Sequence, residues 1–161
     1  MSPQDRIDQE LAGQAWVPRV LRSFRPTLLI ADDDAATRSL LRGQLSESFL
    51  IVAVARDANE AIALAELHRP DAALLDAEMP GASARAVVRE IDARSPETCM
   101  VILSGDDPRK VVVETASAGV ISYVRKGVGA VRLVNALTDA LAVKTGIAGV
   151  RMTATGRQPP P

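Results

Sequence analysis

The chain has 161 residues, 47% of them hydrophobic and 24% charged, and a formal net charge of −1 at pH 7. This composition is typical of a globular domain with a real core, and it argues against general electrostatic affinity for nucleic acid or anionic membranes. No apolar run approaches the roughly 20 residues of a membrane helix. The polar N-terminus lacks the apolar run of a signal peptide, so we expect a cytoplasmic protein.

Residues 1–26 differ in pattern from the rest of the chain, and we treat them as an N-terminal extension. Ile7 and Leu11 are four apart among polar residues, as on a short amphipathic helix. A second short apolar face among arginines is formed by Val20, Leu21 and Phe24. Two interpretations stay open. The segment is a frayed leader, or it is a helix that docks on the domain, on a partner or on a second copy in a homodimer.

From Thr27 the chain alternates between strand-like and helix-like stretches. Short apolar runs, typical of strands buried on both faces, lie at residues 27–31, 50–54, 72–76, 99–103 and 120–124. Apolar residues at helical spacing predict helices around residues 37–45, 58–65, 84–91 and 130–141. One further helix is predicted to begin at Asp106 or Asp107 and to end at Gly119, with a weak propensity because Val111–Val113 are β-branched.

This alternation predicts an α/β fold, with a doubly wound, five-stranded parallel sheet and helices on both faces. Residues 27–144 would form the domain. Residues 145–161 hold Thr, Gly and Ala and close with three prolines, and we expect a disordered tail. The carboxyl ends of parallel strands share one edge of the sheet, which is where such sheets bind ligands.

Polar side chains collect at that predicted edge. Asp32 and Asp33 follow the first strand, Asp76 ends the third, Ser104 follows the fourth and Lys126 follows the fifth. Each residue alone has a plain structural interpretation, as a helix cap, a turn hydroxyl or a surface lysine. Their joint placement at successive strand ends favours a functional site.

The chemistry of this group points to phosphoryl transfer. Three converging carboxylates repel one another and need a cation, and an all-oxygen ligand set suits Mg²⁺. Lys126 and Ser104 supply a positive charge and a hydroxyl donor for the oxygens of a phosphoryl group. Asp76 would then be the nucleophile and would form an acyl phosphate.

These residues stand in motifs that resemble the receiver domains of response regulators in two-component signalling. The matching motifs are Leu-Ile-Ala-Asp-Asp-Asp, Ala-Leu-Leu-Asp-Ala-Glu-Met-Pro-Gly, Val-Ile-Leu-Ser-Gly and Ala-Gly-Val-Ile-Ser-Tyr-Val-Arg-Lys. The resemblance covers about residues 27–144, and the order and spacing of the motifs match. It implies a flavodoxin-like sheet with the strand order 2-1-3-4-5.

The resemblance also implies roles for the acidic residues. Asp32 and Asp33 would hold Mg²⁺, together with Asp76 and the backbone carbonyl of Glu78. Asp76 would be the phosphoacceptor. Its phosphoryl group would come from the phosphohistidine of a histidine kinase or of a phosphotransfer protein in a phosphorelay.

A switch is implied as well. Ser104 resembles the hydroxyl that contacts the phosphoryl group, Lys126 the lysine that pairs with it, and Tyr123 the aromatic residue that turns inward when Ser104 moves. We expect phosphorylation to rearrange the face formed by the fourth helix, the fifth strand and the fifth helix, where a downstream protein of unknown identity would bind.

The sequence departs from the family pattern at three positions. Gly127 stands where the family often has proline after the lysine, which puts the geometry of that turn in question. Glu78 and Asp106 lie two residues after Asp76 and Ser104, at positions that influence the lifetime of the phosphate in the family, and both are acidic here. We expect them to change how hydrolytic water is oriented.

Two other functions were weighed. A haloacid-dehalogenase-like phosphatase uses a similar set of residues, but Ala36 departs from its motif and Lys126 follows the later acidic pair instead of preceding it. A receiver-like interaction module that is never phosphorylated is the second alternative. We do not expect an enzyme beyond self-phosphorylation and autodephosphorylation.

Three further features have a structural interpretation. Cys99 lies in an apolar run and is expected to be a buried structural thiol, and His68 is expected to be an ordinary residue at a helix C-terminus. After residue 144 too little chain follows for an output domain, so we expect a stand-alone receiver or one cut from a longer chain.

Overall fold

The computed structural model describes residues 25–105 and 120–154, and of residues 120–121 and 145–154 it describes the backbone alone. The N-terminal segment 1–24 and the predicted helix at 106–119, with Asp106, lie outside the described residues. Within the described ranges no helix is both long enough and apolar enough to cross a membrane.

A five-stranded, fully parallel sheet forms the centre of the molecule. Its strands are β1 (Thr27–Ala31), β2 (Leu50–Ala55), β3 (Ala72–Asp76), β4 (Cys99–Ser104) and β5 (Val120–Arg125), paired in the order β2-β1-β3-β4-β5. This is the flavodoxin-like order that the motifs implied. The order makes β1 and β3 neighbours, so that their carboxyl ends lie side by side.

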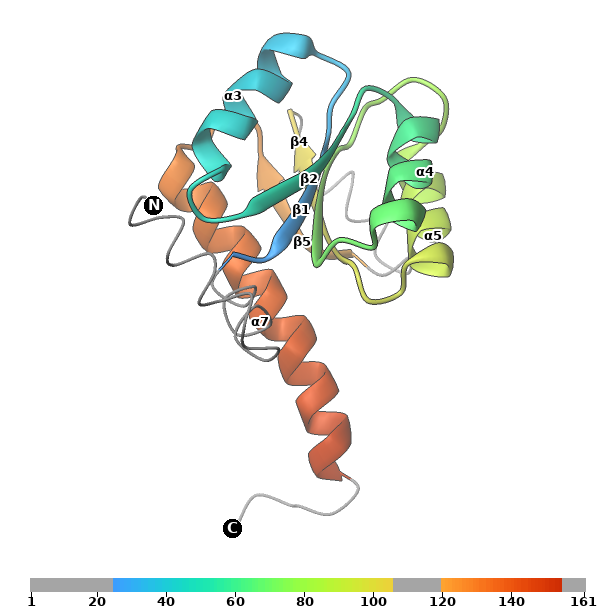
Figure 1. Cartoon of the computed structure of the whole chain (residues 1–161), viewed down its shortest axis with the longest axis vertical. Helices are drawn as coiled ribbons and strands as arrows, with labels where there is room; N and C mark the ends of the chain where they lie inside the picture. The colour runs from blue at the N-terminus through green and yellow to red at the C-terminus, as the bar shows by residue number, and fades with distance from the viewer. Residues whose placement is uncertain (1–24, 106–119, 155–161) are drawn as a thin grey trace, which may run out of the picture.

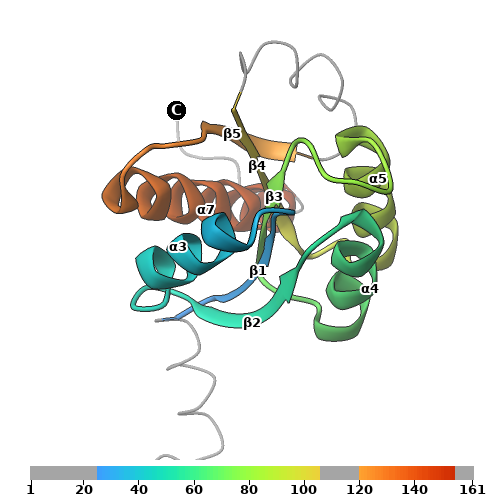
Figure 2. The ribbon, with the colours of Figure 1, turned by 90° about the horizontal axis from the view of Figure 1, so that it is seen from above.

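Helices cover both faces of the sheet, as predicted. They are α3 (Ala35–Leu45), α4 (Ala58–His68), α5 (Ala84–Arg94) and α7 (Ala130–Ala154). Figures 1 and 2 show α3 and α7 on one face and α4 and α5 on the other.

The core explains why the strands are continuously apolar. Leu28 and Ile30 of β1 pack with α3 and α7, whereas the alternating Leu29 and Ala31 pack with α4 and α5. Both faces of the strand are therefore buried, and each fully buried leucine or isoleucine contributes roughly 1.5–3 kcal/mol of transfer free energy. A strand with one polar face could not occupy this position.

Three helices begin directly after loops at the carboxyl edge of the sheet, and side-chain caps fix where they begin. Asp34, Asp57 and Ser83 each accept a hydrogen bond from the backbone N–H three residues on, at the start of α3, α4 and α5. These caps satisfy N–H groups that the first helical turn leaves without partners. They also fix the short loops that join the strand ends to the helices.

Helix α7 is longer than the sequence predicted. It runs for 25 residues, a length of roughly 37 Å, and its last turns extend beyond the sheet (Figure 1). The predicted disordered tail is therefore corrected for residues 145–154, which are helical, while 155–161 lie outside the described residues. The physical reason is that no proline interrupts the chain between the start of the helix at Ala130 and Pro159. The two glycines at 146 and 149 each disfavour a helix by only about 1 kcal/mol.

Candidate functional site

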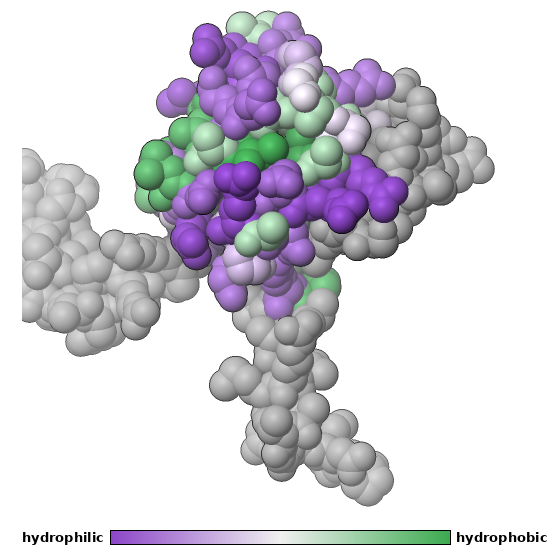
Figure 3. All heavy atoms as spheres, turned by 90° about the vertical axis from the view of Figure 1, so that its right-hand side faces the viewer, coloured by the Kyte–Doolittle hydropathy of each residue, from purple (hydrophilic) through white to green (hydrophobic). Residues whose placement is uncertain are grey.

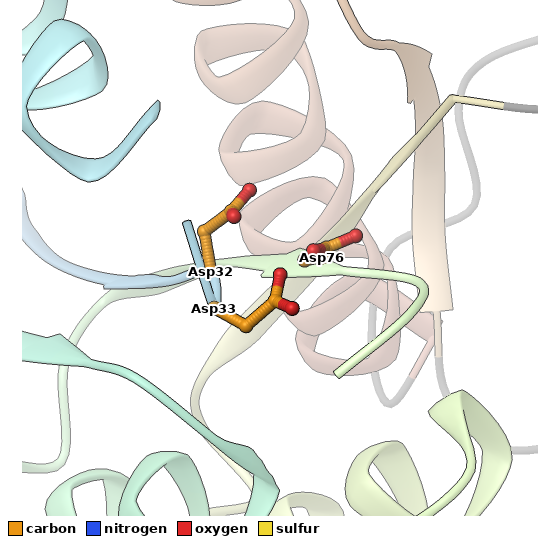
Figure 4. A group of neighbouring side chains, drawn as sticks. All are labelled: Asp32, Asp33 and Asp76. Atoms are coloured by element: carbon orange, nitrogen blue, oxygen red, sulfur yellow. The ribbon is translucent and has the colours of Figure 1, made fainter. Parts of the chain in front are cut away.

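Three carboxylates converge at the carboxyl edge of the sheet. Asp32 and Asp33 follow β1 directly, and Asp76 is the last residue of β3. Because β1 and β3 are neighbours, carboxylate oxygens of the three residues lie within 4.8 Å of one another. Figure 4 shows the side chain of Asp33 reaching towards that of Asp76. The spatial convergence expected from the sequence is present.

Lys126 reaches this cluster from the end of β5, the edge strand on the other side of β3 from β1. It follows β5, and its backbone N–H donates to the carbonyl of Ser104 at 2.7 Å. Its Nζ lies 3.1 Å from Asp76 Oδ2 and 3.4 Å from Asp32 Oδ2. One ammonium group therefore contacts two buried carboxylates.

Each buried carboxylate has one oxygen held by the backbone and one facing the cluster. Asp32 Oδ1 accepts from the N–H of Asp34 at 2.9 Å, and Asp76 Oδ1 accepts from the N–H of Glu78 at 3.0 Å. The Oδ2 atoms of both residues are buried and, within the described part of the chain, have ion pairs with Lys126 but no hydrogen bond of good geometry. Their lone pairs remain available to a ligand.

Contacts from helix α3 fix the loop after β1, which carries Asp32 and Asp33 and is called the acidic loop below. Asp34 caps the helix by accepting from the N–H of Thr37 at 2.9 Å, and from its hydroxyl at 2.6 Å. Arg38, in the second turn of the helix, reaches back and donates from Nη1 to the carbonyl of Asp32 at 2.8 Å. Sequence reasoning missed Arg38. The available signal was its position four residues after the capping aspartate, which directs the side chain back towards the loop.

The electrostatics of the cluster follow from burial. Burial raises the pKa of Asp76, and the nearby charge of Asp32 acts in the same direction, while the backbone N–H of Glu78 and Lys126 oppose them. Burial alone would lower the pKa of Lys126, but the carboxylates of Asp76 and Asp32 outweigh it and raise that pKa. The lysine therefore remains a cation. A further positive charge in the site would favour ionised Asp76.

The other predicted site residues lie around this cluster. Ser104 is buried at the end of β4 and has further interactions of its own. Tyr123 lies on β5, is partly buried and packs against the core beneath α4 and α5. Glu78 lies exposed in the loop after β3, two residues beyond Asp76. Asp106 cannot be placed, because it lies outside the described residues.

The turn after Lys126 differs from the family pattern for a physical reason. Gly127 has a φ angle of +89°. Proline is confined to φ near −65°, so a proline here would require a different turn. Glycine adopts positive φ without steric cost.

The donor set fits a magnesium ion. Three carboxylates offer oxygen ligands within 4.8 Å of one another, and two of their oxygens are buried without a hydrogen bond from the described residues. Hard oxygen ligands at such spacing match the preferences of Mg²⁺, which also retains bound waters. A divalent cation would offset the mutual repulsion of the carboxylates.

A cavity of about 420 Å³ lies elsewhere, between α4 and α5. Figure 3 views this face, where a hydrophobic band is bordered by hydrophilic surface. Arg94 stands at the cavity and pairs with Glu66 at 2.9 Å and with Glu90 at 3.2 Å. The charged side chains that line this cavity are therefore paired with one another and offer no free charge to a ligand. The carboxyl ends of the strands are the better candidate site.

Two residues with chemical potential lie away from the cluster. Cys99 is fully buried in β4, as predicted, and burial raises the pKa of its thiol to about 11. Its thiol is therefore unsuited to be a nucleophile. His68 is the last residue of α4 and is exposed, in keeping with its prediction as a helix C-terminal residue.

The chain is similar to known proteins in both sequence and structure. Residues 28–138 match the family described as response regulator receiver domain. The transcriptional regulatory protein PdtaR of Mycobacterium tuberculosis is 35% identical over 100 residues, which make up 62% of this chain and 48% of that protein. A protein-glutamate methylesterase/protein-glutamine glutaminase of Haloarcula marismortui is 33% identical over 133 residues, 80% of this chain and 36% of that protein. The chain thus matches about half or less of these curated relatives.

Solved structures agree with the sequence matches. The signal receiver domain of the putative response regulator NarL from Mycobacterium tuberculosis superposes with a TM-score of 0.69 at 26% identity, covering 73% of this chain and 97% of that domain. A CheY-like receiver domain protein of Methanospirillum hungatei JF-1 gives a TM-score of 0.70 at 22% identity, covering 76% and 98%, and shows the fold alone. These matches favour the motif-based interpretation over the phosphatase alternative.

Proposed function

The chain belongs to the response regulator receiver domain family, and on that premise we propose that it is a phosphoacceptor in a two-component system or phosphorelay, with Asp76 as the acceptor. One observation carries the proposal. The carboxylates of Asp32, Asp33 and Asp76 and the ammonium group of Lys126 meet at the carboxyl edge of the sheet. Bringing three carboxylates and one ammonium group together in a partly buried site costs free energy, because the carboxylates repel one another and lose solvation. A purely structural element would not need such a group.

The proposed metal ligands are Asp32, Asp33, Asp76 and the backbone carbonyl of Glu78. Magnesium, when bound, supplies positive charge that neutralises the oxygens of the phosphoryl group. The chain's own residues prepare the nucleophile. The N–H of Glu78 holds one oxygen of Asp76, and burial keeps bulk water away from the carboxylate.

In the proposed reaction, a carboxylate oxygen of Asp76 forms a bond to phosphorus while the P–N bond of the donor phosphohistidine breaks. The bonding electrons leave with the imidazole nitrogen, which takes up a proton. Lys126, at 3.1 Å from Asp76, would pair with the phosphoryl oxygens after transfer. Ser104 would supply a hydroxyl donor to the same oxygens.

The proposed output is a rearranged protein-binding face. Movement of Ser104 towards the phosphoryl group would draw Tyr123 inward and alter β5 and the beginning of α7. The predicted fourth helix of this face lies outside the described residues. Hydrogen exchange with and without a fluoroberyllate mimic of the phosphoryl group tests this. Equal protection of β5 and of the start of α7 in the two states would refute it.

The proposed partners are proteins. The donor would be a histidine kinase or a phosphotransfer protein, and the signal would pass to a downstream protein, all in the cytoplasm. Transcriptional regulation and methylesterase activity are named for PdtaR and for the methylesterase, and we do not propose them for this chain. For this chain we propose no direct contact with nucleic acid or membrane, and no enzymatic activity beyond its own phosphorylation and dephosphorylation.

The test uses small phosphodonors and intact-mass spectrometry. The full chain is incubated with Mg²⁺ and either acetyl phosphate or phosphoramidate, which carries the P–N bond type of the natural donor. We expect a single phosphoryl adduct in wild type and in the Asp92→Asn control, whose carboxylate is exposed on α5. We expect none in Asp76→Asn. If wild type gains no adduct from either donor, the non-phosphorylated interaction module becomes the better description.

A further inference from the structure

Arg38 of α3 contacts the backbone of the loop that carries Asp32 and Asp33. It lies in the second turn of α3 and is half-buried. Its Nη1 donates to the backbone carbonyl of Asp32 at 2.8 Å, while its own backbone N–H donates to the carbonyl of Asp34 at 3.0 Å. The guanidinium group is thus engaged with the backbone of the acidic loop and forms no ion pair with its carboxylates.

The contacts of Asp32 and Asp33 differ in a way that makes this hydrogen bond important. Asp32 is held at its N–H, which donates to Ala55 at 3.1 Å, and at Oδ1, which accepts from Asp34 at 2.9 Å. Asp33 is exposed, and none of the described residues hydrogen-bonds its carboxylate. The direction of the Asp33 side chain therefore depends on the backbone that carries it.

The carbonyl that Arg38 binds belongs to the peptide group between Asp32 and Asp33. A peptide group is planar, so holding this oxygen fixes the orientation of the whole unit up to the Cα of Asp33. That orientation sets the direction of the N–Cα bond of Asp33, from which the Cα–Cβ bond branches, so it limits where the carboxylate can point. A hydrogen bond from a charged donor is strong enough to resist rotation of this plane.

We propose that Arg38 is a positioning residue of the candidate metal site. It holds the Asp32–Asp33 peptide group so that the Asp33 carboxylate points at the position it shares with Asp32 and Asp76. The inference rests on the proposed function, because it assumes that a divalent cation occupies that position.

Electrostatics alone predicts the opposite sign, and this makes the inference testable. A guanidinium charge close to the acidic cluster repels a cation, so removing it should tighten magnesium binding. Loss of a positioning contact should instead weaken binding, typically by tenfold or more when an outer-shell partner of a ligand is removed.

The experiment compares three variants with wild type. Arg38→Met removes the donor while keeping the length of the side chain, and Arg38→Lys keeps the charge and can place one donor on the carbonyl. Arg42→Met is the matched control, an exposed arginine one turn along the same helix. Magnesium dissociation constants come from titrations followed by amide chemical shifts, and melting temperatures in EDTA report folding separately.

We expect Arg38→Met to weaken magnesium binding by roughly tenfold, Arg38→Lys to recover most of that loss, and Arg42→Met to bind like wild type. Equal or tighter binding by folded Arg38→Met would overturn the inference while leaving the proposed function intact. If Arg38→Met does not fold, Arg38→Ala replaces it as the variant without the donor. Weaker magnesium binding by Arg38→Ala than by Arg42→Met supports the inference, and equal or tighter binding overturns it. If wild type binds no magnesium, the proposed function and the inference fail together.

Discussion

Replacing the proposed phosphoacceptor should stabilise the protein in the absence of metal. In Asp76→Asn the carboxylate becomes a neutral amide of nearly the same size, so packing in the buried site is preserved. The change removes the repulsion between Asp76 and its two acidic neighbours, and it also removes the attraction to Lys126. The sign of the effect depends on which of these is larger.

The distances give the magnitude. Unit charges 4.8 Å apart, the largest separation of these carboxylate oxygens, repel by about 3.5 kcal/mol at an effective dielectric constant of about 20, so two neighbours cost Asp76 at least about 7 kcal/mol before screening. The ion pair with Lys126 at 3.1 Å returns about 5.4 kcal/mol on the same scale. Solvent screens both the repulsion from the exposed Asp33 and the attraction to the one-third exposed Lys126. These two reductions act in opposite directions on the net effect. We therefore expect Asp76→Asn to raise the free energy of unfolding by roughly 1–2 kcal/mol. The lower cost of burying a neutral amide than a carboxylate adds to this gain.

Thermal unfolding in EDTA at pH 7 measures this difference. For a chain of 161 residues the gain corresponds to a rise in melting temperature of roughly 2–8 °C. Magnesium at a hundred times its dissociation constant should reverse the order, because it stabilises wild type by about 2.7 kcal/mol and should bind Asp76→Asn much less well.

The pH dependence supplies an independent check. Burial raises the pKa of Asp76 above its ordinary value of 3.8, so the charged carboxylate destabilises the folded state only where it is ionised. The advantage of Asp76→Asn should be full above the raised pKa, should shrink as pH falls through it, and should vanish below the ordinary value. A melting temperature equal to or below that of wild type in EDTA at pH 7 would refute the reasoning. The exposed Asp92→Asn control should stay within about 0.5 kcal/mol of wild type.

Three further predictions follow from single contacts. Lys126→Met should destabilise the protein by roughly 1–3 kcal/mol in urea unfolding without metal, less than for a fully buried pair because the lysine is one-third exposed; unchanged stability would contradict the ion-pair geometry. Cys99, fully buried with a pKa of about 11, should not react with an aromatic disulfide reagent at pH 8 until denaturant is added, and rapid native labelling would show that β4 opens readily. Gly127→Ala should lower the free energy of unfolding by about 1 kcal/mol because Gly127 has a positive φ. Gly129 also has open space around it but no positive φ, so Gly129→Ala should leave stability unchanged; equal effects would count against a strained turn.

Much of the fold could be predicted because its strands carry a strong physical signal. The sequence of β3, Ala-Ala-Leu-Leu-Asp, has four apolar residues in a row, and the structure buries all five positions. Only a strand covered on both sides accounts for such a run, which leads to a parallel sheet with helices on each face. The convergence of Asp32, Asp33 and Asp76 follows from that topology, because neighbouring parallel strands end at the same edge.

Elements without a sharp boundary signal were predicted less well. The sequence predicts a helix around residues 130–141 and a disordered tail from residue 145, but α7 continues to Ala154. Lys144 Nζ donates to the carbonyls of Pro96 and Thr98 at 2.8 and 3.1 Å, so the helix still contacts the domain at the last residue whose side chain is described. Composition signals where a helix leaves the core, and not where its hydrogen bonding stops.

Arg38 shows why the identity of site residues and their aim are different problems. The strand pattern places carboxylates at an edge, but it leaves free the rotation of the peptide group between Asp32 and Asp33. That rotation is set by a contact from a helix residue whose own position depends on the cap at Asp34 and on the length of the intervening loop. A cation site needs its ligands aimed to within a fraction of an ångström, so its affinity depends on this local backbone geometry. Substituting Arg38 therefore separates the two contributions, since it leaves every carboxylate in the sequence and changes only what holds one of them in position.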